Sequence, residues 1–204
     1  MKMFHFLRRR DPDQPGFVAN ERGTAIVEFV IVFPMLVWAL LGIFLFWDVF
    51  RAINLAQKSS FTLADNLSRA DSEMTTAYID GLSDLLGYLS EVDPSVGEGV
   101  RLRVSSLKWN MGSGTHEVAW SYSADSASPV LTTAVLPQMA SRLPTLTQFE
   151  TVILVETEVD FVPALSGGDV RLFTMGVGAR TFTEFVVIRP RFLPKICLQN
   201  VSCA

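Results

Sequence analysis

One long apolar stretch dominates the pattern of hydrophobic and polar positions. Between Ala25 and Trp47, 23 residues carry a single charged side chain, Glu28. As a helix, this stretch measures about 34 Å at roughly 1.5 Å per residue. Because the hydrocarbon core of a bilayer is about 30 Å thick, the pattern predicts one membrane-spanning helix over residues 24–48.

Helical periodicity continues beyond the apolar stretch. Small and apolar residues recur at alternating spacings of four and three, which keeps them on one side of a helix, so the first helix is predicted to run from about 24 to 69. These residues are Val49, Ile53, Ala56, Ser60, Leu63 and Leu67.

A second helix is indicated by Ser72 as its N-cap, and it ends at the break formed by Asp93 and Pro94. Its apolar positions are Tyr78, Leu82, Leu85, Leu86 and Leu89.

Alternation with the period of β-strands follows the second helix. Segments 100–109 and 116–122 flank a predicted hairpin loop, and the second segment places Val118, Trp120 and Tyr122 on one face. A short helix is expected near 130–142. Further strands are expected at 151–161, 170–174 and 180–188, with a turn or bulge at 176–178.

Three acids alternate with the apolar residues of the strand at 151–161. Glu156, Glu158 and Asp160 would lie on its second face, because successive side chains of a strand point to opposite faces. This spacing has two interpretations: a cation site built from carboxylates, or a solvated face of the sheet. The solvated face is the more common of the two.

Charge gives the apolar helix an orientation. Residues 1–23 hold five Lys and Arg against three Asp and Glu, and basic residues mark the cytoplasmic flank of a membrane helix. Residues 24–204 hold 12 Lys and Arg against 18 Asp and Glu, a formal charge of −6. This acidic part should lie outside the cytoplasmic membrane, and it is a poor candidate for binding nucleic acid.

Together these features predict an α+β fold. A long N-terminal transmembrane helix continues into an extracytoplasmic domain with an antiparallel sheet of four or five strands. The predicted organisation is a basic cytoplasmic leader at 1–23, the transmembrane helix at 24–48, a helical extracytoplasmic part at 49–92 and a β-rich domain at 93–204.

Both cysteines, Cys197 and Cys203, fall in the extracytoplasmic part, where disulfides persist. A bridge between them would close a short loop and stabilise the C-terminal tail by roughly 2 kcal/mol in the chain-entropy model. Free thiols or an intermolecular bond are the alternatives. A metal site is not expected from two cysteines without a nearby histidine.

The N-terminal region does not fit a cleavable secretory signal. Such a signal has an apolar core of about 7–15 residues followed by small residues at the cleavage site. Here the apolar run is longer, and bulky residues follow it at 48–51. A plain membrane anchor fits the length but leaves Glu28 without a role, unless its carboxylate reaches the cytoplasmic interface.

The spacing around Glu28 gives it a role. Residues 23–29 read GTAIVEF, between a basic leader and an apolar helix. This G-x-x-x-x-E-F pattern resembles the processing site of type IV prepilins, with the aromatic residue of the Flp/Tad branch. With a folded domain of over a hundred residues, the layout resembles the TadE/TadF-like (TadE/TadG-like) minor pseudopilins of the Tad/Flp pilus assembly system.

The resemblance implies how the chain is processed and assembled. A prepilin peptidase would cut between Gly23 and Thr24, and Glu28 and Phe29 would then take part in assembly near the new N-terminus. Pro34 would kink a pilin-like helix. The implied partners are other Tad pseudopilins and pilin subunits, the prepilin peptidase, the inner-membrane assembly platform and the lipid bilayer. The implied location is the bacterial inner membrane, with a single pass and a periplasmic or extracellular C-terminal domain.

No enzyme, cofactor or metal is expected from the sequence. The chain has two histidines, and His116 begins a predicted strand without a catalytic motif around it. Two other functions remain open: an unprocessed single-pass protein whose outer domain binds a ligand or an envelope polymer, and a membrane-anchored hydrolase with a site invisible in sequence.

Overall fold

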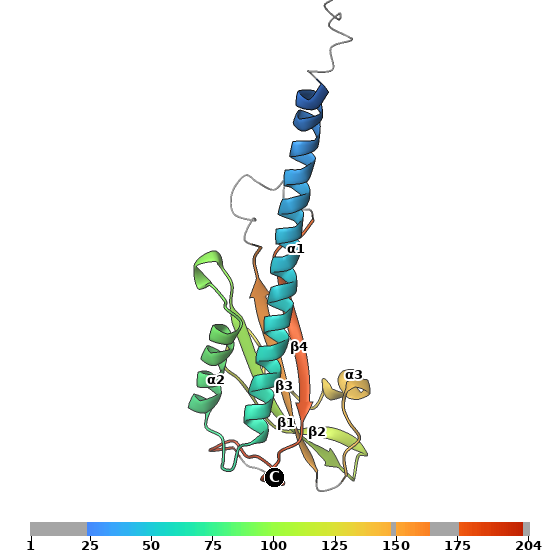
Figure 1. Ribbon diagram of the computed structural model, residues 1–204. Helices are drawn as coiled ribbons and strands as arrows, with labels where there is room; N and C mark the ends of the chain where they lie inside the picture. The colour runs from blue at the N-terminus through green and yellow to red at the C-terminus, as the bar shows by residue number, and fades with distance from the viewer. Residues whose placement is uncertain (1–23, 148–149, 164–175, 202–204) are drawn as a thin grey trace, which may run out of the picture. The chain divides into compact units, whose positions relative to one another are not determined.

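The computed structural model describes residues 24–147, 150–163 and 176–201 (Figure 1). The chain divides into two compact units, Met1–Phe44 and Leu45–Ala204. Within the described residues, the elements in chain order are α1 (Thr24–Ser68), α2 (Thr76–Leu89), η3 (Pro94–Val96), β1 (Val100–Asn110), β2 (Thr115–Ser123), α3 (Leu136–Met139), η4 (Ala140–Arg142), β3 (Thr151–Phe161) and β4 (Arg180–Ile188).

The second unit contains a four-stranded sheet in the order β2-β1-β3-β4, and every neighbouring pair is antiparallel. A long apolar N-terminal helix and an antiparallel sheet confirm the predicted α+β fold. The strand predicted at 170–174 lies outside the described residues.

Within the second unit, α1 and α2 pack on one face of the sheet (Figure 1). The predicted helical seam is confirmed, since Ala56, Ser60, Leu63 and Leu67 are fully buried. They share one core with buried residues of the sheet and of α2, among them Leu102, Val104, Ile153 and Val155 and then Ile79, Leu82 and Leu86.

Hydroxyl groups join α1 to its neighbours inside this core. The Ser60 hydroxyl pairs with the Thr157 hydroxyl of β3, and the Ser59 hydroxyl lies 3.0 Å from that of Ser90 at the end of α2. Because Ser is small, the backbone of α1 approaches the sheet closely. Because each hydroxyl has a partner, this approach leaves no buried polar group unsatisfied.

The N-terminus of α2 differs from the prediction. Thr75, and not Ser72, is the N-cap, and its side chain accepts a hydrogen bond from the backbone N–H of Tyr78. Both residues have capping side chains, but only Thr75 directly precedes the first helical residue.

A Thr75→Ala variant should therefore lose about 1 kcal/mol of unfolding free energy, the usual value of a side-chain N-cap. The matched variant Ser72→Ala should stay within about 0.5 kcal/mol of the unmodified protein. Urea unfolding of both variants measures the difference. If both lose the same unfolding free energy, the side chain of Thr75 is not the N-cap.

A β-bulge in β2 changes which side chains point to each face of the sheet. Ser106 pairs with Trp120 and Leu107 with Val118, so Ala119 is the extra residue. The prediction that Val118, Trp120 and Tyr122 share a face is therefore wrong. Trp120 and Tyr122 pack in the core under the helices, whereas Val118 packs in a second cluster on the other face.

That second cluster lies over part of the sheet's other face. Leu136 of α3 and Leu143 pack there against Leu107, Val152 and Leu154, and the guanidinium of Arg142 lies 4.0 Å from the ring centroid of Phe185. The helix expected near 130–142 is present only as α3 and η4.

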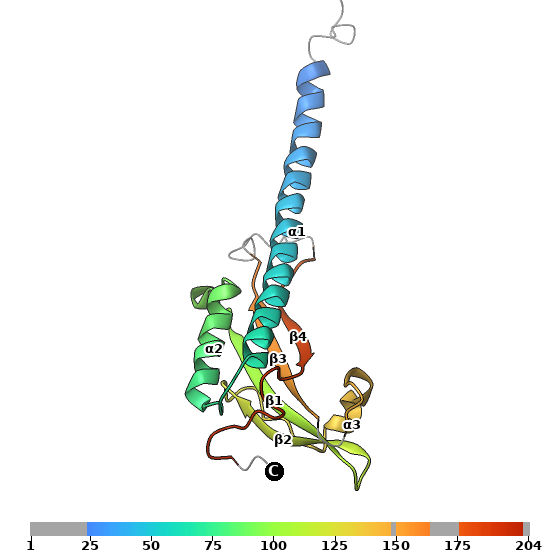
Figure 2. The ribbon, with the colours of Figure 1, turned by 60° about the horizontal axis from the view of Figure 1, so that its bottom comes forward.

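The C-terminal segment docks back onto the core (Figure 2). Met74 donates its N–H to the carbonyl of Cys197, and its own carbonyl accepts from Gln199. Ile196 and Leu198 are buried, and the indole N–H of Trp120 donates to the carbonyl of Ile196. The segment therefore ties the α1–α2 connection to β2.

Candidate functional site

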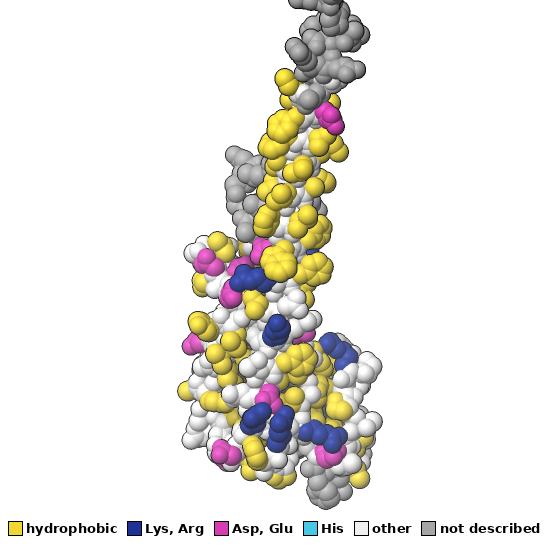
Figure 3. Space-filling view, viewed as in Figure 1, with side chains coloured by type: hydrophobic (Ala, Val, Ile, Leu, Met, Phe, Trp, Pro, Cys, Tyr) yellow, Lys and Arg dark blue, Asp and Glu magenta, His cyan; other side chains and the backbone are white. Residues whose placement is uncertain are grey.

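The apolar part of α1 is exposed in the isolated chain. Every described side chain from Ile26 to Leu40 is solvent-exposed, with Ile26 and Met35 each 68% exposed. Figure 3 shows hydrophobic side chains along this part of the helix. By length and composition the helix is able to cross a membrane. A helix that is apolar on all sides requires lipid or other helices around it.

Glu28 interrupts this apolar surface near its start. It is the fifth residue of α1 and the only Asp, Glu, Lys or Arg between Thr24 and Trp47. The side chain is exposed, and no hydrogen bond or ion pair joins its carboxylate to another residue in the described part of the chain. Since residues four apart face the same side of a helix, Glu28 lies one turn from Thr24, on its side of α1.

An aromatic pair lies beside this carboxylate. The rings of Phe29 and Phe33 stack with centroids 5.0 Å apart and planes at 25°. Both side chains are more than half exposed. Pro34 lies inside α1, and the helix continues through it. The start of α1 therefore combines one carboxylate with a flat aromatic surface.

Two of the residues singled out from the sequence lie outside the described residues, Gly23 and Cys203. The predicted cut between Gly23 and Thr24 and the predicted Cys197–Cys203 bridge therefore remain predictions. Cys197 itself is disulfide-bonded.

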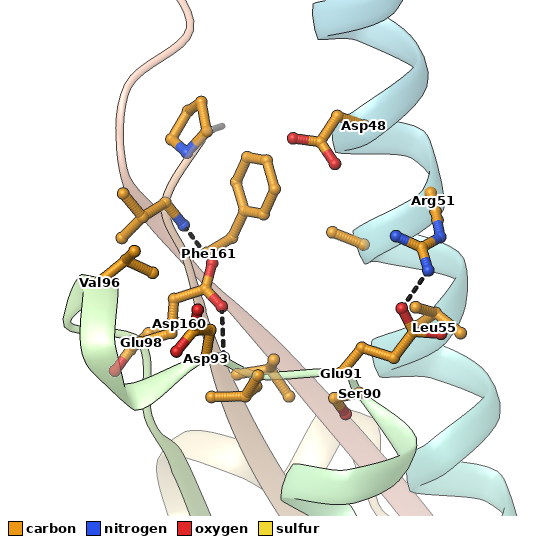
Figure 4. A pocket seen from close by; sticks show the side chains of 15 residues that line it. Asp48, Arg51, Leu55, Ser90, Glu91, Asp93, Val96, Glu98, Asp160 and Phe161 are labelled. Atoms are coloured by element: carbon orange, nitrogen blue, oxygen red, sulfur yellow. Dashed lines mark hydrogen bonds and ion pairs between the residues drawn. The ribbon is translucent and has the colours of Figure 1, made fainter. Parts of the chain in front are cut away.

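The second unit contains a cavity of about 570 Å³ between α1, the end of α2 and the end of β3 (Figure 4). Carboxylates are prominent in its lining. Among the described lining residues, Arg51 is the only Lys or Arg, and apolar side chains such as Leu55 and Phe161 complete the wall. The acidic residues are Asp48, Glu91, Asp93, Glu98 and Asp160.

Two of the cavity's carboxylates make contacts that stabilise the fold. Glu98 accepts from the N–H groups of Asp93 and Val162, which braces the η3 loop against the end of β3. Glu91 pairs with Arg51. Within the described ranges, no three His, Cys, Asp or Glu side chains are grouped to hold a metal ion.

The three acids of β3 are engaged by arginines of β1. Arg103 donates to Glu156, and Arg101 donates to both Glu158 and Asp160. These are cross-strand pairs, and their side chains are between 12% and 38% exposed. Because Arg101 and Arg103 pair with all three carboxylates, this face is a set of partly buried ion pairs and not simply a solvated face.

The environment of this cluster shifts its pKa values. The hydrogen bond to Glu156 raises the pKa of Arg103 despite the opposing effect of burial. Burial alone would raise the pKa of Asp160, but hydrogen bonds from Arg101 and Thr181 outweigh it and lower that pKa. The ionised form of Asp160 is thus favoured by folding.

Replacing Arg101 with Met should therefore destabilise the protein most where Asp160 is ionised. A carboxylate with a depressed pKa contributes stability above its unfolded pKa, about 4, and loses it as pH falls through the folded value. The difference in unfolding free energy between the unmodified protein and Arg101→Met should be largest at pH 7 and should become smaller below about pH 4.

Urea unfolding between pH 7 and pH 3 measures this difference. Arg189→Met is the matched control, because its ion pair with Glu150 is more exposed and should contribute less than about 1 kcal/mol at any of these pH values. If this difference in unfolding free energy does not change with pH, Arg101 stabilises the protein through packing and not through its charge.

His116 has a structural position. Its Nε2 lies 3.0 Å from the carbonyl oxygen of Pro144, and its ring meets that of Trp109 edge-on at 5.0 Å. The imidazole thereby holds the chain before β3 against the β1–β2 hairpin.

Comparison of the chain with protein-family models, with curated proteins and with solved structures finds no match.

Proposed function

We propose that this protein is a minor pseudopilin-like structural component of a Tad/Flp-type pilus assembly system in the bacterial inner membrane. The observation that carries the proposal is the start of α1, where the carboxylate of Glu28, which has no partner among the described residues, lies in a helix surface that is otherwise apolar and exposed. Such a surface suits a helix that packs among other helices within a bilayer.

The chemistry of Glu28 supports this role. A charged side chain in mid-membrane costs about 2.5–3.5 kcal/mol on insertion scales, and pairing with an opposite charge offsets that cost. Cleavage before Thr24 would create a positive amine one helical turn from Glu28. In a bundle, the carboxylate of one subunit would pair with the amine of its neighbour and fix the register between them.

The proposed orientation follows the charges. The basic leader lies in the cytoplasm, Trp47 lies at the outer interface, and the acidic second unit lies outside the membrane. There the domain would initiate, cap or support the fibre together with other Tad pseudopilins and pilin subunits.

A second candidate is an unprocessed single-pass protein whose outer domain binds a small ligand. The cavity beside α1 favours it, because about 570 Å³ falls within the usual range for ligand pockets, about 300–1,000 Å³.

Site-specific crosslinking separates the two candidates. A photoreactive phenylalanine analogue at Phe29 should crosslink to pilin-type helices in native membranes, since this exposed ring adjoins Glu28. The same analogue at Tyr88, an 81% exposed residue of α2, controls for non-specific reaction. Crosslinks from position 29 to lipid alone would contradict the pseudopilin role.

A further inference from the structure

Among the strands that the structure describes, β4 forms one edge of the sheet (Figure 1). It pairs with β3 from Arg180 to Ile188 without a register shift. In an antiparallel ladder, alternate residues direct their N–H and C=O groups toward opposite neighbours, so about half of these groups in β4 point away from β3. In the part of the chain that the structure describes, no hydrogen bond engages them.

The opposite edge, β2, is protected. It carries the bulge at Ala119, and the N–H of Val118 donates to the hydroxyl of Thr133 in the chain that runs alongside. Leu131 in the same chain donates to the hydroxyl of Ser121. Bulges and covering loops are ordinary means of preventing a further strand from pairing with an edge.

Within the described ranges, β4 has neither a bulge nor a hydrogen-bonded segment alongside it on the side away from β3. Its sequence, RTFTEFVVI, contains no Pro and no Lys, and its pairing with β3 contains no bulge. Such an edge is a template for an extended peptide, because the peptide's backbone supplies the missing donors and acceptors.

A hollow of about 400 Å³ adjoins the C-terminal end of this edge. Phe61 of α1 lies in its lining and is 60% exposed. Arg189 and Arg191 also line it, with side chains 57% and 58% exposed. Figure 3 shows Lys and Arg side chains gathered at this end of the unit.

These arginines retain hydrogen-bonding capacity. Arg189 donates to Glu150 at 3.0 Å and Arg191 to Asp65 at 2.7 Å. A guanidinium has five N–H donors, so each exposed side chain can bind a further carboxylate. The hollow thus offers an apolar ring and two cations to whatever lies along β4.

We propose that β4 is a docking edge for an extended segment of a partner protein. The segment adds to the sheet antiparallel to β4, like every other strand pair in the sheet. Near its N-terminal end, an acidic residue reaches Arg189 and Arg191, and an apolar residue covers Phe61. Docking at this edge is independent of what the apolar part of α1 does.

The test uses the full chain in detergent micelles and a labelled peptide, Asp-Asp-Val-Thr-Val-Thr-Val-Thr-Val-Thr. Binding is measured by fluorescence anisotropy, and amide exchange of β4 should slow when the peptide is added. Two N-methylated forms of the peptide probe the backbone, each modified at one alternate set of residues. Only one set faces β4, so only one form should lose affinity, by about tenfold or more.

Side-chain variants test the hollow. Phe61→Ala and the double change Arg189→Gln with Arg191→Gln should each weaken peptide binding about tenfold. The matched controls are Tyr88→Ala and Arg51→Gln, which alter an exposed aromatic and an exposed ion-paired arginine away from the hollow. Both controls should bind the peptide unchanged.

Three results would overturn the proposal. One is equal binding of the two N-methylated peptides, which indicates side-chain adsorption. Another is slow hydrogen exchange of the β4 amides in the protein without peptide at every protein concentration, which indicates that the chain covers its own edge. The last is hydrogen exchange of the β4 amides that slows as protein concentration rises, which indicates that a second copy of the chain binds this edge.

Discussion

Replacing Glu28 with Gln should abolish incorporation into the fibre while leaving membrane insertion intact. Gln keeps the size of the side chain and its hydrogen-bonding oxygen but removes the charge. In the assembled bundle, the terminal amine of a neighbouring subunit would then lack its partner. Removing one member of a buried ion pair costs about 3–5 kcal/mol, so incorporation should fall by a factor of about 100 or more.

Insertion should survive the same change, because a neutral side chain is easier to place in lipid than a carboxylate. Membrane fractionation and quantification of the protein in sheared fibres measure the two properties separately. Asp48→Asn is the matched control, since it removes a carboxylate from the same helix just beyond the apolar segment. Normal assembly of the Glu28→Gln variant would remove the proposed role of this residue.

Replacing Leu63 with Ala should destabilise the second unit by about 2–5 kcal/mol. Leu63 is fully buried and packs in the core that α1 shares with α2 and the sheet. Truncation removes buried apolar surface and leaves a cavity, and native domains are stable by only about 5–15 kcal/mol. The variant should therefore unfold at clearly lower urea concentration.

The tryptophans of the sheet provide the signal for this measurement, because Trp120 is 3% exposed and sits in the same core. Phe61→Ala is the matched control: it lies two residues away on α1 and is 60% exposed. It should stay within about 0.5 kcal/mol of the unmodified protein. Equal losses for the two variants would mean that α1 does not pack on the sheet through this seam.

The features predicted correctly from the sequence depend on local periodicity. The seam of Ala56, Ser60, Leu63 and Leu67 follows from helical spacing alone, and each of these residues is buried. The strand boundaries follow from alternation in the same way. The choice of Thr75 over Ser72 as N-cap was harder, because two capping residues stand three positions apart and spacing does not distinguish them.

The errors and omissions depend on contacts between distant segments. The bulge at Ala119 reverses the side of Val118, and it is set by pairing with β1. The acids of β3 meet Arg101 and Arg103 only through the β1–β3 register. Both strands alternate charges in the sequence, so a signal existed, but the register that matches them is long-range. The Ser60–Thr157 hydroxyl pair, 97 residues apart, had no local signal.

Two features meet at the start of α1, a sequence spacing and an exposed apolar surface. The spacing from Gly23 to Glu28 suggests a processing site, and the structure adds an exposed apolar helix with an unpartnered carboxylate. Cleavage before Thr24 would connect these two observations, because it would place an amine one helical turn from Glu28.

The most direct test of processing before Thr24 is the identity of the N-terminal residue of the protein purified from its native membrane. Intact mass and sequencing of the terminal peptide identify it without any variant. The mature chain should begin at Thr24. A chain that keeps its leader and begins at Met1 would contradict this prediction, because Glu28 would then have no terminal amine to pair with.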